Sequence, residues 1–309
     1  MSQAKIIVSD IIPDAILSAL SSHARLVKLS DQEHWEGSIA CLATAFDTID
    51  TKIIESLPDS VKLISNIGAG VDKIDLEAAK KRGIPVCNTP IVAIDTADLT
   101  FGLILSTLRN MSLSERALRA GDWNKGANAL GTSVRSKVLG IVGAGNIGAE
   151  VARRAHAFGM TLTYFGPNRK PALEAELPIT YYEEVDNLFS EADVVALTCP
   201  LNASTRHIIN ASSLSKMKSS AFLINTGRGE LVDENALADA LENGVIAGAG
   251  LDVFENEPSV NPRLLSLDRV TVTPHIGGAT VECRQAIVQQ AIENITVYLT
   301  SGTVQNRVG

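Results

Sequence analysis

Three side chains that could bind an anion or move a proton stand after predicted strands in the second half of the chain. Arg228 lies between two glycines, Glu257 precedes a proline, and His275 follows one. Open α/β sheets bind their ligands outside the carboxyl ends of the strands, and an uncrowded arginine can present its guanidinium fork to a carboxylate. Each residue also has an ordinary alternative, since a loop Arg or Glu is usually solvated and His275 could be purely structural.

A glycine-rich turn joins an apolar stretch to a helical one at residues 138–158. Gly143, Gly145 and Gly148 have the spacing Gly-x-Gly-x-x-Gly, which is much more specific when it closes a strand and opens a helix. Gly143 permits the tight turn, Gly145 lets the backbone approach a pyrophosphate, and Gly148 allows close packing of helix on strand. Free N–H groups at the helix start meet the anion. The turn therefore predicts dinucleotide binding, with a merely structural turn as the alternative.

The end of the following strand indicates which dinucleotide is preferred. NAD sites usually carry an acidic residue about 20 residues after the glycine turn, where it binds the ribose hydroxyls. Here no Asp or Glu occurs between Glu150 and Glu174, and the predicted strand 161–165 leads into Asn168, Arg169 and Lys170. Because arginine pairs well with phosphate, we expect NADP(H) to be preferred, with NAD(H) possible. A solvated loop with no cofactor preference is the alternative.

Short apolar segments alternate with helical ones along the whole chain, a pattern typical of parallel sheets covered by helices. A first series of strands is predicted over residues 5–8, 39–43, 62–65 and 85–87, with helices over 13–22 and 75–82. A second series is predicted over 137–142, 161–165, 194–197, 221–225, 247–252 and 270–273. A long helix over 96–120 connects the two, and a last helix over 281–300 could pack back onto the first domain.

Composition narrows the class of protein. The 309 residues suit about two domains, and the net charge of −8 argues against nucleic-acid partners. The start of the chain lacks the apolar region of a signal peptide, and no uninterrupted apolar run is long enough to span a membrane. We therefore expect a soluble cytoplasmic protein. Its four cysteines stand singly, without a partner at metal-ligand spacing, so no metal site is expected.

These motifs, in this order, resemble the D-isomer-specific 2-hydroxyacid dehydrogenase family over nearly the whole chain. Besides the glycine turn, the resemblance rests on segments 66–72 (NIGAGVD), 88–90 (NTP), 96–98 (TAD), 226–229 (TGRG), 251–254 (LDVF) and 274–278 (PHIGG). It implies an α/β protein of two Rossmann-like domains, in which a doubly wound cofactor domain is inserted into a flavodoxin-like substrate domain. The expected boundaries are 1–95 with 283–309 for the substrate domain, and 96–282 for the dinucleotide-binding domain.

The resemblance also implies roles for individual residues in the reduction of a 2-oxo acid. His275 would protonate the developing alkoxide, and Glu257 would hold the imidazolium in place. Arg228 would bind the substrate carboxylate and polarise its carbonyl, and the backbone N–H groups of Ala69 and Gly70 would bind the other carboxylate oxygen.

The cofactor contacts implied by the family pattern lie at several strand ends. Asp252 would bind the nicotinamide carboxamide near Thr96, while Asn146 and Ile147 would face the pyrophosphate. Cys199 and Pro200 fall in the loop beside the adenosine, where Cys199 departs from the more usual His or Asn. The implied cofactor-binding set is Thr96, Gly143, Gly145, Asn146, Ile147, Gly148, Asn168, Arg169, Lys170, Cys199, Pro200, Thr226 and Asp252.

Related activities and a different class of function remain as alternatives. Formate dehydrogenases pair their histidine with Gln, so Glu257 argues against that activity, whereas phosphite dehydrogenases keep the Glu. Glyoxylate or hydroxypyruvate reduction best suits NADPH, with larger 2-oxo acids as close rivals. A dinucleotide-binding regulator or corepressor could use the same scaffold. The apolar helix over 96–120 and the following Trp123 resemble the family's dimerisation region, which predicts a homodimer, although Trp123 could instead lie in the core of one chain.

Overall fold

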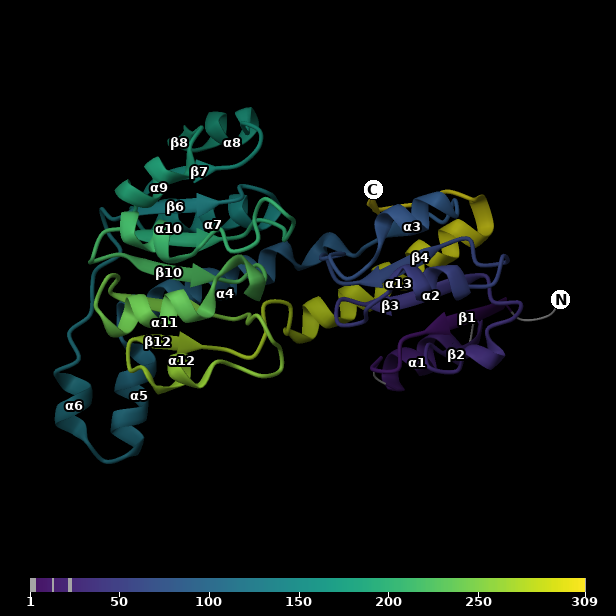
Figure 1. The fold of residues 1–309 in the computed structure, drawn as a ribbon, viewed down its shortest axis with the longest axis horizontal. Coiled ribbons are helices and arrows are strands. Elements are labelled where there is room, and N and C mark those ends of the chain that lie inside the picture. Colours follow the sequence, from purple (N-terminus) through teal and green to yellow (C-terminus); the bar gives the residue numbers. More distant parts are fainter. Residues whose placement is uncertain (1–3, 13, 22–23, 309) are drawn as a thin grey trace. The chain divides into compact units, whose positions relative to one another are not determined.

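The chain forms two compact units, each built around its own sheet. The computed structural model describes residues 4–308 apart from 13 and 22–23. One unit consists of residues 1–92 and 279–309, and the other of residues 93–278. In Figure 1 the first unit is coloured purple to blue together with the yellow end of the chain, and the second runs from teal to green.

The first unit has a six-stranded sheet that is parallel except for one edge strand. Its order is β13-β5-β4-β3-β1-β2, and β13 pairs antiparallel to β5. The strands are β1 (Ala4–Val8), β2 (Ala24–Lys28), β3 (Ala40–Thr44), β4 (Ile64–Ile67), β5 (Val86–Cys87) and β13 (Arg307–Val308). The helices are α1 (Asp14–Ser21), α2 (Thr51–Ser56), α3 (Leu76–Lys81) and α13 (Val281–Ser301). Residues 13 and 22, the ends of the first predicted helix, lie outside the described residues.

The terminal helix α13 belongs to this first sheet. It packs on β4, and its Ala291 and Ile295 are buried with Ile6, Val8 and Leu42 of the sheet. The chain thus leaves the first unit after residue 92 and returns to it at residue 279.

The second unit has a seven-stranded, wholly parallel sheet with the order β12-β11-β10-β9-β6-β7-β8. Its strands are β6 (Val138–Val142), β7 (Thr161–Phe165), β8 (Ile179–Tyr182), β9 (Val194–Leu197), β10 (Phe222–Asn225), β11 (Gly248–Leu251) and β12 (Val270–Val272). Its helices are α4 (Ala93–Leu108), α5 (Met111–Arg119), α6 (Trp123–Ala127), α7 (Asn146–Ala157), α8 (Pro171–Glu176), α9 (Val185–Glu191), α10 (Ala211–Lys216), α11 (Glu234–Glu242) and α12 (Pro262–Ser266).

The strand order of this second sheet reverses between β6 and β9, and this point determines where a ligand can bind. From β6 the chain adds β7 and β8 on one side, and then β9 to β12 on the other. In doubly wound sheets the crevice at such a reversal accepts the dinucleotide. Strands β9 and β11 are buried along their whole length, as expected for parallel strands covered on both faces.

The predicted helix over 96–120 is two helices, so that expectation was wrong. Helix α4 ends at Leu108, and Asn110 has a left-handed backbone (φ 51°) before α5 begins at Met111. Asparagine adopts this conformation more readily than most residues. The segment Pro90–Leu108 is long and apolar enough to cross a membrane by length and composition. However, its Ala97, Phe101 and Ile104 are buried in the core of the second unit.

Helices α5 and α6 project from the rest of the second unit as an arm (Figure 1). Asp122 caps α6 by accepting a hydrogen bond from the Lys125 N–H at 2.9 Å. Trp123 is 70% exposed, which excludes the alternative that it is a core tryptophan. Met111 and Leu118 of α5 and Leu130 shortly after α6 are also exposed, so several large apolar side chains lie on the surface of this region.

Candidate functional site

The glycine turn has the geometry of a phosphate-binding turn. Gly143 has φ +98°, and a Cβ there would lie 2.5 Å from Cys199 Cα. A Cβ on Gly148 would lie 2.4 Å from the Gly143 carbonyl oxygen. A side chain at either position would displace backbone, so both glycines are required for packing. At Gly145, by contrast, a Cβ would meet nothing within 4 Å, which leaves the backbone open to a ligand.

The turn is held by two hydrogen bonds to the Gly143 carbonyl. The Thr198 hydroxyl and the Gly145 N–H both donate to the Gly143 carbonyl, at 2.8 and 2.9 Å. Helix α7 begins directly afterwards at Asn146, and the first N–H groups of a helix have no partner within it. Asn146 is exposed and Ile147 half-buried. An open glycine followed by a helix start fits a dinucleotide pyrophosphate.

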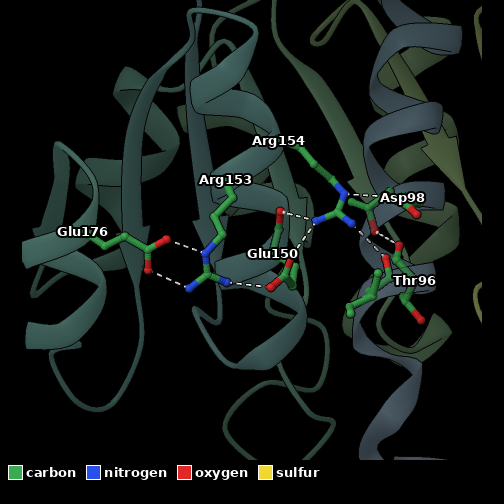
Figure 2. Close-up of polar contacts among 8 residues, drawn as sticks. Thr96, Asp98, Glu150, Arg153, Arg154 and Glu176 are labelled. Atoms are coloured by element: carbon green, nitrogen blue, oxygen red, sulfur yellow. Dashed lines mark hydrogen bonds and ion pairs between the residues drawn. The ribbon is translucent and has the colours of Figure 1, made fainter.

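Helix α7 is fixed to its surroundings by arginine–carboxylate pairs, which Figure 2 shows. Arg154 donates to Asp98 of α4 at 2.6 Å and to Glu150 at 2.7 Å, and Arg153 joins Glu150 to Glu176 of α8. These bonds connect α7 to the beginning of α4, where Thr96 lies. Sequence reasoning missed the network, because its members are brought together only when the helices pack.

The residues expected to bind the 2′-phosphate of NADP(H) are exposed after β7, but one of them is paired with a carboxylate. Asn168, Arg169 and Lys170 are all exposed. Arg169 Nη2 donates to Glu174 Oε2 at 2.7 Å and Arg169 Nε to Oε1 at 3.2 Å. The guanidinium also lies over the Tyr181 ring, with 5.6 Å from Cζ to the ring centroid. The sequence argument counted Glu174 only as the next acid along the chain.

Three threonines connect α4 to the strand end that carries Arg228. The Thr100 and Thr226 hydroxyl oxygens are 2.7 Å apart, and the Thr100 hydroxyl donates to the Thr96 carbonyl at 2.7 Å. All three residues are buried. Thr96 and Thr226 were predicted at the cofactor site, whereas Thr100 was missed. Its position one helical turn after Thr96 was the available signal.

Arg228 is presented by a tightly built turn after β10. The buried Asn225 side chain donates to the Arg228 carbonyl at 2.8 Å and accepts from the Gly227 N–H at 3.1 Å. A Cβ on Gly229 would lie 1.9 Å from the Phe254 carbonyl carbon, so this glycine allows the turn to lie against the Glu257 segment. Arg228 Nη1 donates to the Gly227 carbonyl at 2.9 Å.

His275 and Glu257 meet as an imidazole–carboxylate pair after the neighbouring strands β12 and β11. His275 Nδ1 lies 2.7 Å from Glu257 Oε2, and the two side chains are 30% and 26% exposed. The other carboxylate oxygen accepts the Phe254 N–H at 3.0 Å. Burial raises the pKa of Glu257, but the hydrogen bonds from His275 and Phe254 and the charges of His275 and Arg228 outweigh it and hold the pKa below its usual value.

Asp252 organises the segment that carries His275. Its Oδ1 accepts the Thr273 hydroxyl at 2.6 Å and the Ile276 N–H at 2.8 Å, and its Oδ2 accepts the Gly277 N–H at 2.9 Å. The Asp252 carbonyl accepts the His275 N–H at 2.8 Å. Burial raises the pKa of this carboxyl, and the hydrogen bonds partly offset that effect. A cofactor amide at Asp252 would have to share these oxygens.

Cys199 and Pro200 follow β9 and border the glycine turn. Cys199 is buried, and burial raises the pKa of its thiol to about 11. A thiol of this kind is neutral at physiological pH and packs as a small apolar group. Pro200 is exposed, and its carbonyl accepts the Thr205 hydroxyl at 2.8 Å.

In the first unit, Ala69 and Gly70 lie on a loop after β4 in which side-chain amides bind three consecutive carbonyls. Asn88 donates to the Ala69 carbonyl at 2.7 Å, and Asn66 donates to the carbonyls of Gly68 and Gly70. The Asn88 carbonyl in turn accepts from Asn294 of α13 at 3.0 Å. Because Asn66 and Asn88 bind these carbonyls, the backbone N–H groups of the loop can be offered to an anion.

Among the described residues, no group of three or more His, Cys, Asp and Glu side chains is placed to hold a metal ion. In the second sheet, the glycine turn, Thr226, Arg228, Asp252, Glu257 and His275 all follow the carboxyl ends of parallel strands, so the predicted set gathers at one edge.

A doubly wound sheet with a glycine turn at its switch point and an imidazole–carboxylate pair at its strand ends defines a nicotinamide-dependent oxidoreductase. Residues 101–277 match the family model described as "D-isomer specific 2-hydroxyacid dehydrogenase, NAD binding domain". The chain belongs to the D-isomer-specific 2-hydroxyacid dehydrogenase family, and it is an enzyme of that class.

Relatives and solved structures agree with this assignment. The chain is 42% identical over 259 residues to the glyoxylate reductase of Pyrococcus horikoshii, covering 82% of this chain and 77% of that protein. It is 43% identical over 240 residues to the hydroxypyruvate reductase of Thermotoga maritima, covering 76% and 77%. The NADPH-dependent glyoxylate/hydroxypyruvate reductase of Sinorhizobium meliloti, crystallised with NADP and malonate, superposes with a TM-score of 0.92 at 34% identity, covering 100% of this chain and 97% of that one.

Proposed function

We propose that this chain reduces a small 2-oxo acid, glyoxylate or hydroxypyruvate, to the D-2-hydroxy acid with NADP(H). The observation that carries the proposal is the 2.7 Å bond between His275 and Glu257, on strand ends adjacent to the one that presents Arg228. Relatives named glyoxylate reductase and hydroxypyruvate reductase support the substrate class.

The catalytic roles follow from the chemistry of the reduction. The bound nicotinamide supplies the hydride. Because Nδ1 of His275 is engaged by Glu257, Nε2 is the nitrogen that donates a proton to the alkoxide oxygen. Glu257 is ionised and favours the imidazolium, and Arg228 binds the carboxylate and polarises the carbonyl. The backbone N–H groups of Ala69 and Gly70 bind the second carboxylate oxygen.

The cofactor is held by this chain's turns and strand ends. Gly143, Gly145 and Gly148 shape the pyrophosphate turn, and the N–H groups of Asn146 and Ile147 face the anion. Asn168, Arg169 and Lys170 contact the 2′-phosphate, Cys199 and Pro200 line the adenosine loop, and Thr96, Thr226 and Asp252 lie toward the nicotinamide. NADPH should give a higher kcat/KM than NADH, and a clear preference for NADH would contradict this part of the proposal.

The chain is further proposed to act as a homodimer that associates through the arm formed by α5 and α6. The support is the exposure of Met111 and Leu118 on α5, Trp123 on α6 and Leu130 shortly after it, because gathered exposed apolar side chains often mark an interaction surface.

Replacing the proton donor tests the mechanism. We expect His275→Ala to lower kcat by at least ~100-fold, since positioned acids contribute this much or more, and to leave NADPH affinity nearly unchanged. His34→Ala is the matched control, because His34 also pairs with a carboxylate, Asp31, at 2.7 Å, but in the first unit. Near-wild-type turnover of the His275 variant would remove His275 from the mechanism.

A further inference from the structure

A cluster of polar side chains outside the proton-transfer site surrounds Arg169. Its guanidinium is bound at two points by Glu174, with 2.7 Å and 3.2 Å between the bonded atoms. Figure 2 shows a second arginine–glutamate pair on the same helix α8, where Glu176 binds Arg153 at two points. Only the first pair lies at the end of β7, where the 2′-phosphate is proposed to bind.

Glu174 is fixed more firmly than its partner. Its side chain is 19% exposed, against 64% for Arg169. The Tyr164 hydroxyl donates to Glu174 and accepts the Lys170 N–H at 2.6 Å. The hydrogen bonds from Arg169 and Tyr164 lower the pKa of Glu174, and the carboxylate is therefore charged in the pH range where the enzyme would work.

The Arg169–Glu174 pair has no net charge, although its more exposed member is the guanidinium. A 2′-phosphate that approaches Arg169 must share the guanidinium donors with a carboxylate and is repelled by that carboxylate. Tyr181 supports the guanidinium from its ring face, and Tyr181 is itself anchored by a bond from its hydroxyl to the Gly166 carbonyl at 3.1 Å. Arg169 therefore keeps one means of support that does not depend on Glu174.

We infer that Glu174 is a specificity-determining residue that limits how strongly this chain favours a 2′-phosphorylated dinucleotide. The carboxylate neutralises the cation that would otherwise attract the phosphate, and this allows NADH to compete. The inference rests on the proposed cofactor site, since it requires Arg169 to face the 2′-phosphate.

The test compares Glu174→Gln with Glu176→Gln in the full-length protein. Each variant removes one negative charge from α8, and Gln can still accept the Tyr164 hydroxyl. The probes are adenosine 2′,5′-bisphosphate and AMP, which differ only in the 2′-phosphate, and calorimetry gives the Kd of each. We expect Glu174→Gln to bind the bisphosphate roughly two- to fivefold more tightly, a range typical of exposed charge pairs, with AMP affinity unchanged.

Two further measurements separate an effect of the Glu174 charge on bisphosphate affinity from an effect of Glu174 on the position of Arg169. The gain in Glu174→Gln should shrink at high salt, because exposed charges are screened, and Glu176→Gln should leave the ratio of the two Kd values unchanged. An unchanged or lower preference for the bisphosphate in Glu174→Gln would overturn the inference, since it would mean that Glu174 is neutral or mainly positions Arg169. Glu174→Ala provides a second variant with the same expected direction.

A third variant, Arg169→Gln, shows whether a negative result concerns only the role of Glu174 or the proposed 2′-phosphate site itself. If Arg169→Gln lowers the preference for the bisphosphate while Glu174→Gln does not raise it, only the role of Glu174 is wrong. If Arg169→Gln leaves the preference unchanged, the proposed 2′-phosphate contact is wrong as well.

Discussion

His275 adopts a backbone conformation that few side chains accept, and its neighbours hold it there. Its φ is 54°, in the left-handed region that costs energy for residues other than glycine. The His275 N–H bonds to the Asp252 carbonyl, while the Asp252 carboxylate holds the Ile276 and Gly277 N–H groups. Strained residues of this kind gather at functional sites, and the imidazole at this position meets Glu257 at 2.7 Å.

The charge of Glu257 should control the pH dependence of reduction. Reduction needs a protonated His275, and the Glu257 carboxylate stabilises that form. Glu257→Gln should therefore shift the pH–rate profile of reduction, with retained folding by circular dichroism. An unchanged profile would show that Glu257 does not tune the acid.

The same residue links pH to stability with a defined sign. The pKa of Glu257 is lowered in the folded chain, so its contribution to the free energy of unfolding is present above the unfolded-state pKa and is lost as the pH falls through the folded-state pKa. The stability difference between the wild type and Glu257→Gln should accordingly narrow on acidification.

At the scale of elements, the arm formed by α5 and α6 is the feature that sequence reasoning described least well. The Leu- and Ala-rich composition predicted one helix from residue 96 to 120, which ends near Gly121. The left-handed Asn110 ends α4 and redirects the chain. After this break, α5 and α6 project from the rest of the second unit (Figure 1).

The arm should mediate self-association. Light scattering at working concentration should give about twice the chain mass of 32.8 kDa, and Trp123→Asp should lower that mass by placing a charge in an apolar interface. Ser112→Asp on α5 is a control for added charge on the arm. A monomeric mass for the wild type would refute the dimer.

For the whole molecule, the sequence predicted the strands of the second sheet that carry chemistry, because buried parallel strands are continuous apolar runs. It missed β2, β8 and β13. Strand β13 has two residues and exists through pairing with β5, more than 200 residues away in sequence, so no local signal marks it. Strands β2 (ARLVK) and β8 (ITYY) mix polar with apolar residues and are only partly buried.

The candidate site shows the same limit. The glycine turn and the strand-end residues were predictable because each is a local motif. Bonds such as Asn294 to Asn88, which join residues 206 apart, depend on tertiary packing. The pairing of Arg169 with Glu174 could have been considered from the sequence, since the two residues are five apart. Whether their side chains meet, however, depends on where α8 begins.

The most direct test of the account is a reductase assay on the intact protein. The purified chain is mixed with NADPH and a panel of 2-oxo acids that includes glyoxylate, hydroxypyruvate and larger or aromatic members, and the absorbance of the reduced nicotinamide is followed. The account predicts rapid oxidation of NADPH with glyoxylate or hydroxypyruvate, and the D-isomer as product. Tight NADPH binding without oxidation by any acid of the panel would contradict it and would favour a dinucleotide-binding regulator on the same scaffold.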